Sequence, residues 1–209
     1  MKLWMKLSRN AFEELSRSGK LKTEQPGDFS EVKERDAHDF LGNQLRQCVK
    51  SPANTFRYPL LAWYQKDGKK HLREYLLQNA DSDCVILTLE VPREQFQLFD
   101  ERLFCYVKRA YYIPENEGDL QRHELVMEKM NLNYEKLSGK DDVSLAVQCV
   151  KRVIEASWQR IFDLKREDGY IYGMNSRKSI QAALWEIKIE QIRKVEMVCL
   201  SDLTLDRGA

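Results

Sequence analysis

The sequence has few of the residues that build disulfide frameworks or metal sites. Of its 209 residues, five are cysteine and three are histidine. The cysteines are odd in number and scattered, mostly among apolar neighbours, so we expect buried small hydrophobic residues rather than disulfides or a zinc site. The histidines lie far apart and lack the spacing of metal ligands, so we expect no metal site. These eight residues are Cys48, Cys84, Cys105, Cys149, Cys199, His38, His71 and His123.

Strong charge and long apolar runs are also missing. The formal net charge is only +1, so no global field draws the chain to nucleic acid or to an anionic membrane. No apolar run approaches the roughly 20 residues that span a bilayer, and the first 15 residues lack the apolar core of a signal peptide. The sequence therefore predicts a cytoplasmic protein without a membrane partner.

Short catalytic motifs are absent as well. The chain contains no phosphate-binding P-loop, no G-x-G-x-x-G, no nucleophile elbow and no H-E-x-x-H. Function therefore has to be inferred from weaker patterns.

What the sequence does contain is enough apolar material for a packed core. Hydrophobic residues make up 43% and charged residues 32% of the chain, which is typical of one globular domain over residues 1–209. Apolar runs and alternation predict strands, and apolar residues at helical spacing predict helices. We place strands at residues 3–7, 58–65, 84–91, 180–189 and 193–200, and helices at 31–50, 103–112, 119–137 and 142–162. A further short helix begins after an Asn10 N-cap and ends at Gly19.

Strands and helices do not alternate in a strict βαβ rhythm, and the late strands can pair antiparallel with the early ones. This favours an α+β fold, with mixed or antiparallel sheets and flanking helices, over a doubly wound sheet. Residues 23–30, 169–176 and 201–209 are expected to be loops or a frayed end.

The strand at residues 180–189 has two distinct faces. Strand alternation points Gln181, Ala183, Trp185, Ile187 and Ile189 to one side and the residues between them to the other. The first face is either an ordinary half-buried strand surface or the wall of a ligand site.

Two further patterns allow binding. Trp63 and Tyr64, together with Trp4, could stack a base or a nicotinamide, although core packing is the alternative. Residues 66–73 carry five basic or potentially basic side chains, which could hold a phosphate or a nucleic-acid backbone. The alternative for this stretch is a solvated turn at Asp67-Gly68.

Residues 157–195 resemble the carboxy-terminal signature of the bacterial family known as domain of unknown function 3841. Further matches occur in the family's order: LW at residues 3–4, DAHDFLGNQL at 36–45, YPLLAWYQ at 58–65, LTLEVP at 87–92 and YYIP at 111–114. They cover nearly the whole chain. The chain departs from the family where a Ser-Asp-Phe, then Trp-His and Asn, are usual. Those positions hold Phe99, Asp100 and Glu101, then Phe104, Cys105 and Arg109, and Leu61 replaces a common tryptophan.

The order of elements is also similar to that of DNA ADP-ribosylating toxins. This resemblance implies NAD bound in a cleft between two small antiparallel sheets, with a glutamate on the late strand. A carboxylate suits this chemistry because positive charge develops in the transition state. Here the corresponding residues, Gln181 to Ala183, include no acid, and Glu186 is expected on the opposite face.

Three hypotheses follow. The first is a nucleotide-binding, ADP-ribosyltransferase-like domain, active or degenerate, whose NAD cleft is lined by Trp63, Tyr64, Gln181 and Trp185, with Arg57 for a phosphate. The second is a non-catalytic interaction module of a bacterial stress or phage-defence system, which binds a protein partner or a second copy through the helices of residues 119–162. The third is a nucleic-acid-binding protein that uses residues 66–73.

Overall fold

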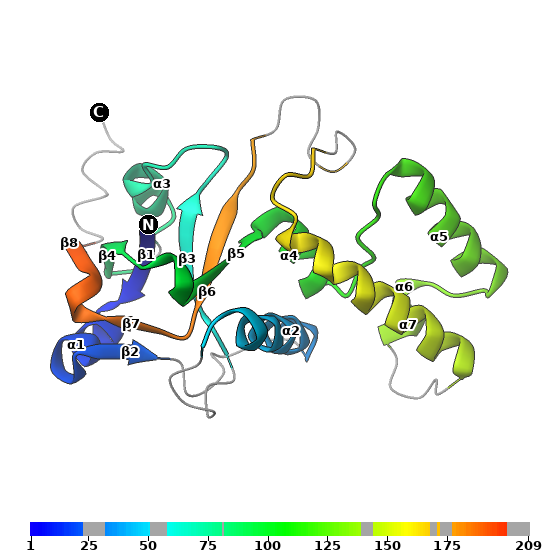
Figure 1. The fold of residues 1–209 in the computed structure, drawn as a ribbon, viewed down its shortest axis with the longest axis horizontal. Coiled ribbons are helices and arrows are strands. Elements are labelled where there is room, and N and C mark those ends of the chain that lie inside the picture. The colour runs from blue at the N-terminus through cyan, green and yellow to red at the C-terminus, as the bar shows by residue number, and fades with distance from the viewer. Residues whose placement is uncertain are drawn as a thin grey trace.

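The chain folds into two antiparallel sheets with helices around them (Figure 1). This computed structural model describes residues 1–22, 32–50, 58–80, 82–138, 144–167, 171 and 177–199. The predicted α+β class is confirmed. The predicted loop at residues 23–30 and the carboxy-terminal end at 201–209 lie outside the described residues, as does most of the loop at 169–176. A single domain over residues 1–209 stays a prediction.

The main sheet has six strands in the order β5-β6-β3-β1-β4-β8, and every neighbouring pair is antiparallel. The predicted pairing of late strands with early ones is therefore confirmed, because β6 pairs with β3 and β8 pairs with β4. The strands are β1 (Lys2–Ser8), β3 (Leu60–Gln65), β4 (Cys84–Glu90), β5 (Phe96–Asp100), β6 (Ile180–Leu184) and β8 (Ile192–Val198). A second sheet joins β2 (Lys20–Lys22) to β7 (Glu186–Lys188).

The strands with the clearest apolar pattern in the sequence lie inside the sheet. β4 is apolar along most of its length because both of its faces are covered, and Pro92 follows it where no ladder hydrogen bond is needed. The edge strand β5 was not predicted. It has only five residues after a short 3-10 turn, η1 (Arg93–Gln95), so alternation has little length in which to show.

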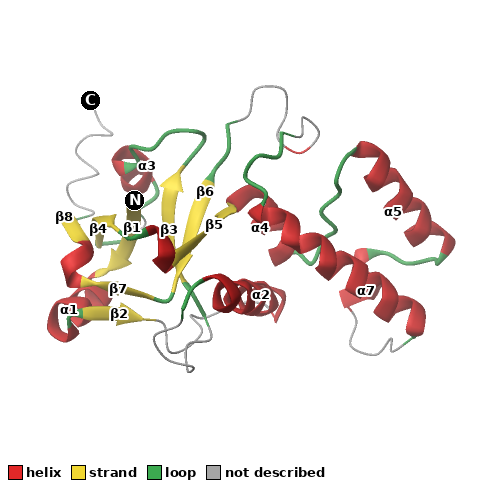
Figure 2. Cartoon of the chain, in the orientation of Figure 1, coloured by secondary structure: helices red, strands yellow, loops and turns green. Residues whose placement is uncertain are grey.

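Helix positions agree with the sequence better than helix ends do. Helix α1 (Arg9–Ser18) begins at Ser8, whose hydroxyl accepts the Ala11 N–H, so the predicted Asn10 cap is wrong by two residues. Its end at Gly19 is confirmed, with a left-handed φ of 75°. The other helices are α2 (Val32–Cys48), α3 (Arg73–Gln78), α4 (Glu101–Lys108), α5 (Glu117–Lys129), α6 (Tyr134–Ser138) and α7 (Leu145–Ser157) (Figure 2).

The helix predicted over residues 119–137 is two helices. The chain leaves α5 after Met130 and takes a positive φ of 49° at Asn131 before α6 begins. Asparagine tolerates this conformation better than most residues, and its place between two apolar positions hid the break. The helix predicted over 142–162 is α7 followed by a 3-10 turn, η2 (Trp158–Phe162).

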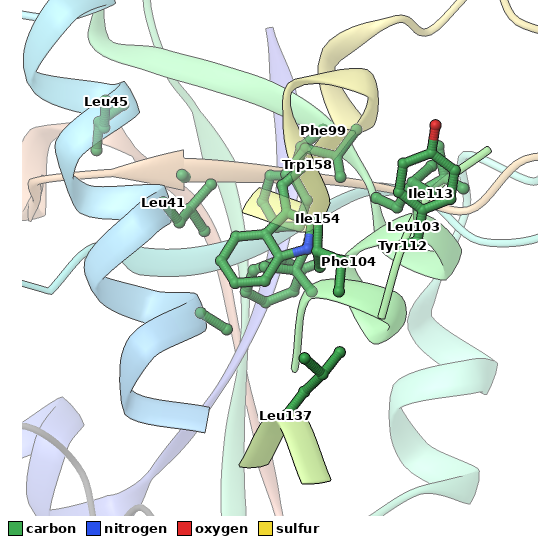
Figure 3. Close-up of a cluster of buried hydrophobic side chains, with 14 of the residues drawn as sticks. Leu41, Leu45, Phe99, Leu103, Phe104, Tyr112, Ile113, Leu137, Ile154 and Trp158 are labelled. Carbon is green, nitrogen blue, oxygen red and sulfur yellow. The ribbon is translucent and has the colours of Figure 1, made fainter. Parts of the chain in front are cut away.

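The two faces of the main sheet carry separate cores. On one face, α2, α4 and η2 cover β5 and β6, and side chains from these elements and from α7 form one cluster with Phe99, Ala183 and Trp185. Figure 3 shows Leu41, Phe104, Ile154 and Trp158 meeting in this cluster. On the opposite face, α1 and the small sheet cover the middle strands in a second cluster. A third, smaller cluster lies under α3.

The predicted alternation of the closing strand is correct as far as Trp185 and wrong beyond it. Ala183 and Trp185 belong to the core of α2, α4 and α7, whereas Ile187 belongs to the opposite core and Ile189 is 49% exposed. The strand changes partners at Trp185, leaving β3 and β5 to pair with β2, and β6 and β7 run in different directions in Figure 1. Successive side chains of a strand alternate between its two faces, so a break that shifts this alternation by one residue places the following side chains on the opposite face.

The expectation of buried cysteines is wrong for most of them. Only Cys84 is buried, while Cys48 and Cys149 are exposed and Cys105 and Cys199 are intermediate. Neighbouring apolar residues are a poor guide here, because adjacent helix positions point in different directions. None of the described helices is long and apolar enough to cross a bilayer.

Candidate functional site

The main sheet divides into two three-stranded halves at the boundary between β1 and β3. These two strands share a single register pair, Trp4 opposite Trp63, whereas β1 and β4 share seven. The halves β5-β6-β3 and β1-β4-β8 therefore separate on either side of this pair. At such a boundary, a continuous ladder of hydrogen bonds does not hold the backbone and the side chains next to it.

Trp63 is half-buried beside this boundary. Its ring meets the ring of Tyr75, on α3, edge to face at 5.5 Å, and it contacts the cluster under α3 that contains Trp4. Trp4 itself is only 4% exposed, and its indole N–H donates to the Lys70 carbonyl at 2.9 Å. The indole N–H of Trp63 makes no hydrogen bond within the described part of the chain.

Gln181 lies directly opposite Trp63 on the neighbouring strand β6. Residues paired in this way project to the same face of a sheet, so the glutamine amide and the indole are neighbours. Gln181 is also half-buried, and its side chain makes no hydrogen bond to any residue that the structure describes. On its other side it pairs with Phe99, which is fully buried.

A charged pair lies next to Trp63. The Lys66 ammonium is 5.4 Å from the Trp63 ring and 5.6 Å from the Tyr75 ring, and it forms an ion pair with Glu101 at 3.7 Å. The Cys105 thiol, one turn along α4, donates to Glu101 at 3.6 Å. Burial and the nearby carboxylate raise the pKa of this thiol, so Cys105 stays protonated near neutral pH and is a poor nucleophile.

The group formed by Trp63, Tyr75, Lys66, Glu101 and Gln181 is named the junction face. It combines an indole ring for stacking, an amide whose donors and acceptors have no partner among the described residues, a cation and a carboxylate. Lys66 and Glu101 keep about a fifth of their side-chain surface exposed, 23% and 22%, so both charges are reachable from solvent. These groups can hold a polar ligand that also presents a flat ring.

The structure brings together only part of the predicted site. Trp63 and Gln181 are neighbours, but Tyr64 lies at a bulge in β3 and packs on the opposite face, where the Lys70 ammonium is 5.0 Å from its ring.

Trp185 is 2% exposed and lies in the core, and its indole N–H donates to the Val49 carbonyl at 3.4 Å. A side chain buried in this way packs the core and does not line a surface opening. Arg57 lies outside the described residues.

The basic stretch of residues 66–73 forms the predicted turn. Asp67 and Gly68 both have positive φ, 48° and 76°, and Lys66 and Lys69 exchange both backbone hydrogen bonds. This is the geometry that Asp-Gly favours. Lys66 pairs with Glu101, and Arg73 pairs with Glu196, so two of the cations are already neutralised. Nucleic-acid binding here stays a prediction.

Sequence reasoning missed Tyr75 and the carboxylate of Glu101 as members of the site. Glu101 begins α4 directly after β5, and its N–H donates to the Ser179 carbonyl next to β6 at 2.9 Å. Because β5 was not predicted, nothing in the sequence brought Glu101 beside the closing strand. Among the described residues, no three His, Cys, Asp or Glu side chains group in a way that could hold a metal ion.

Comparison with known proteins identifies the family. The model of the family described as domain of unknown function DUF3841 matches residues 2–193. No curated protein and no solved structure matches the chain. Since the family match covers nearly all of the sequence, the chain belongs to the DUF3841 family.

Proposed function

We propose that this protein binds a nucleotide of the NAD type on the junction face. The observation that carries the proposal is the pairing of Trp63 with Gln181. Two polar side-chain groups, an indole N–H and a carboxamide, lie side by side where the sheet divides, and neither has a hydrogen-bond partner in the described part of the chain. Half-buried polar groups without internal partners are suited to recognising a polar ligand.

Each part of a dinucleotide has a matching group. The exposed part of the Trp63 ring stacks a base or a nicotinamide, which is the usual use of a half-buried indole in nucleotide sites. The Gln181 amide donates to and accepts from ribose hydroxyls. Lys66 lies within 6 Å of the Trp63 ring and supplies a positive charge for a phosphate once its contact with Glu101 loosens.

Glu101 offers the negative charge that β6 lacks. Cleavage of the glycosidic bond of NAD builds positive charge on the ribose, and a nearby carboxylate stabilises that charge. Glu101 comes from the start of α4 rather than from the late strand, and it is paired with Lys66 at 3.7 Å. NAD binds at the junction face, and release of nicotinamide during incubation with NAD shows whether binding leads to cleavage.

Titration with NAD tests the proposal. We expect NAD to raise the melting temperature, because a ligand that binds only the folded state stabilises it, and to quench part of the tryptophan fluorescence. Loss of one neutral hydrogen bond in Gln181→Ala should weaken NAD binding about three- to tenfold. Loss of stacking in Trp63→Leu should weaken it about tenfold or more.

Two matched variants serve as controls. Gln97→Ala removes another half-buried glutamine from the neighbouring strand β5, and Tyr64→Leu removes an aromatic ring from the opposite face of β3. Both should bind NAD as the unchanged protein does. Equal affinities in all four variants, or no thermal shift with NAD, NADH or ATP at millimolar concentration, would show that the junction face is not a nucleotide site.

The alternative function, a protein-interaction module, has its own observation. Helices α5 and α7, together with the residue that follows α5, leave large apolar side chains at the surface: Leu125 (53% exposed), Val126 (43%), Met130 (45%), Leu145 (75%) and Val153 (52%). Apolar residues of this size at a helix surface are typical of contact regions. Sedimentation that finds a monomer at all concentrations, with no partner retained, would remove this alternative.

A further inference from the structure

A cavity of about 440 Å³ lies among the helices, away from the junction face. Its walls come from the end of α4, the segment at residues 111–114, one side of α5 and the start of α6. It shares no lining residue with the junction face. The lining residues are Tyr106, Tyr111, Tyr112, Pro114, Leu120, His123, Glu124, Met127, Glu128, Leu132, Asn133 and Tyr134.

Aromatic rings make up much of this wall. Tyr112 stacks on His123 with ring centroids 4.1 Å apart and planes at 13°, and Tyr111 meets Tyr134 at 4.5 Å. The Tyr134 hydroxyl lies 3.4 Å from His123 Nε2 and accepts the Tyr112 N–H at 3.4 Å. The rings therefore hold one another in fixed orientations around the cavity.

Hydrogen bonds behind the rings fix this wall in place. The Tyr112 hydroxyl donates to Asp119 at 2.7 Å, and Asp119 also accepts the Glu115 N–H at 2.8 Å and pairs with Arg160 at 3.5 Å. The Trp158 indole donates to the Tyr111 carbonyl at 3.0 Å. A wall that is already ordered costs little conformational entropy when a ligand binds.

The charged side chains of the cavity are all acidic. Glu124 and Glu128 lie one turn apart on α5, and no lysine or arginine is among the described lining residues. Like charges at this spacing repel each other, and neither carboxylate forms an ion pair with a described residue. Burial lowers the pKa of His123, which keeps the imidazole neutral at pH 7. The Arg160 guanidinium does not line the cavity, but it lies 5.4 Å from the Tyr112 ring, where it pairs with Asp119 and Glu115.

The end of α5 adds to this polarity. The cavity runs along α5 from Leu120 to Glu128, and its part next to Leu132 and Asn133 lies beside the carboxy-terminal end of the helix. The helix dipole makes that end partly negative. Electron-rich ring faces, two carboxylates and a negative helix end all favour the same kind of ligand, a positive charge spread over an apolar surface.

We propose that this cavity binds a small organic cation, with a methylated ammonium group held against Tyr111 and Tyr134 and next to Glu124 and Glu128. Ammonium groups that carry methyls are less strongly hydrated than lysine, so they leave water for an aromatic site more easily. An anion would be repelled by both glutamates. A neutral apolar molecule would gain nothing from them. This inference goes beyond nucleotide binding and does not rest on it.

Calorimetric titration at constant ionic strength tests the charge requirement. The probe is choline, and the comparison compound is 3,3-dimethylbutan-1-ol, which has the same shape with carbon in place of the charged nitrogen. We expect choline to bind about tenfold more tightly than the neutral alcohol, a difference that cation–π and carboxylate contacts can supply. Equal affinity for both compounds, or no binding of choline, would overturn the proposal.

Variants locate the site. Glu124→Gln combined with Glu128→Gln should weaken choline binding severalfold and leave the affinity for the alcohol unchanged. Glu117→Gln, on the same helix but outside the cavity, should change neither affinity.

Tyr111 is 36% exposed, so Tyr111→Leu should still fold and should bind choline less well, while Tyr111→Phe keeps the ring and should keep the choline affinity. Choline affinity that survives in both the double glutamine variant and Tyr111→Leu would disprove the site. Binding of NAD is measured separately on these variants and should be unchanged, so the two proposals fail independently.

Discussion

The six-stranded sheet and the helical lobe formed by α5, α6 and α7 are packed in different ways. In the sheet, Leu3, Leu87 and Phe99 are completely buried, because helices or the small sheet cover both faces. In the lobe, α7 buries Val147, Val150 and Ile154, but α5 buries only His123 and Met127, and a cavity remains beside α5. Figure 1 shows α5 and α7 lying to one side of the sheet, with α4 between.

This contrast separates residues that stabilise the fold from residues that are available for contacts. Buried strand residues gain stability from apolar burial on both faces of the sheet. The exposed apolar residues of the lobe contribute little to the core, so they are available to a ligand or a partner. Both the cavity and the candidate partner surface lie in the lobe, whereas the junction face lies where the sheet itself divides.

Replacing Trp185 gives the largest expected effect. Trp185→Ala should lower the free energy of unfolding by about 3–5 kcal/mol, as expected when a large buried aromatic side chain is removed. Met130→Ala, a change at the 45% exposed surface of the lobe, should cost less than about 0.5 kcal/mol. Urea unfolding of both variants makes the measurement. Similar losses in the two would mean that the lobe is packed as tightly as the sheet.

Helix caps offer a second comparison, because both regions begin helices with side-chain caps. Asp100 is completely buried and accepts the Arg102 and Leu103 N–H groups at the start of α4, while Asn116 is exposed and accepts the Asp119 N–H at the start of α5. Asp100→Ala should cost about 2 kcal/mol and Asn116→Ala about 0.5–1 kcal/mol. Asp100→Asn, which keeps a capping oxygen, should lose less than Asp100→Ala. The reverse order would contradict the assignment of the stronger cap to the sheet.

Acid should act on the lobe through His123. Burial lowers the pKa of this imidazole in the folded protein, so the unfolded state takes up the proton first. The stability that this adds is complete above the unfolded pKa of about 6.5 and is lost as pH falls through the lower folded pKa. Unfolding curves at pH 7.5 and 5.5 should therefore show a larger loss for the unchanged protein than for His123→Gln. Parallel losses would mean that His123 is not responsible.

Surface changes on the lobe should have the smallest effect on stability. Leu145→Ser, at a position 75% exposed, should change the free energy of unfolding by no more than about 0.5 kcal/mol. If the lobe binds a partner or a second copy, the same variant should weaken that association in sedimentation velocity. Association that is unaffected by this change and by Leu125→Ser would move the contact away from these helices.

The sequence was informative where local patterns and burial agree. The run around β4 predicted a strand because a strand covered on both faces needs apolar residues throughout. Gly19 predicted a helix end because it accepts a left-handed backbone, and Asp67-Gly68 predicted a tight turn for the same reason. The pairing of Trp63 with Gln181 was within reach, since both strands were predicted and both residues were singled out.

Other features depended on neighbours that no local pattern records. Trp185 looked like part of a cleft because strand parity placed it beside Gln181, but helix α2, with Leu41 and Leu45 in the same cluster, covers it. Glu101 became part of the junction face only through β5, whose five residues are too few to reveal a period. The aromatic cavity is built from α4, α5 and α6, which meet only once the chain is folded.

The sequence by itself therefore determined the α+β class, most elements, one helix end and one tight turn, because each of these follows from interactions between residues close together in the chain. Tertiary structure decided which aromatic residues are buried and which are exposed to solvent. It also decided where the sheet divides and which charged side chains form ion pairs. Those outcomes are set by contacts between distant segments, such as Trp4 with Trp63 and Lys66 with Glu101.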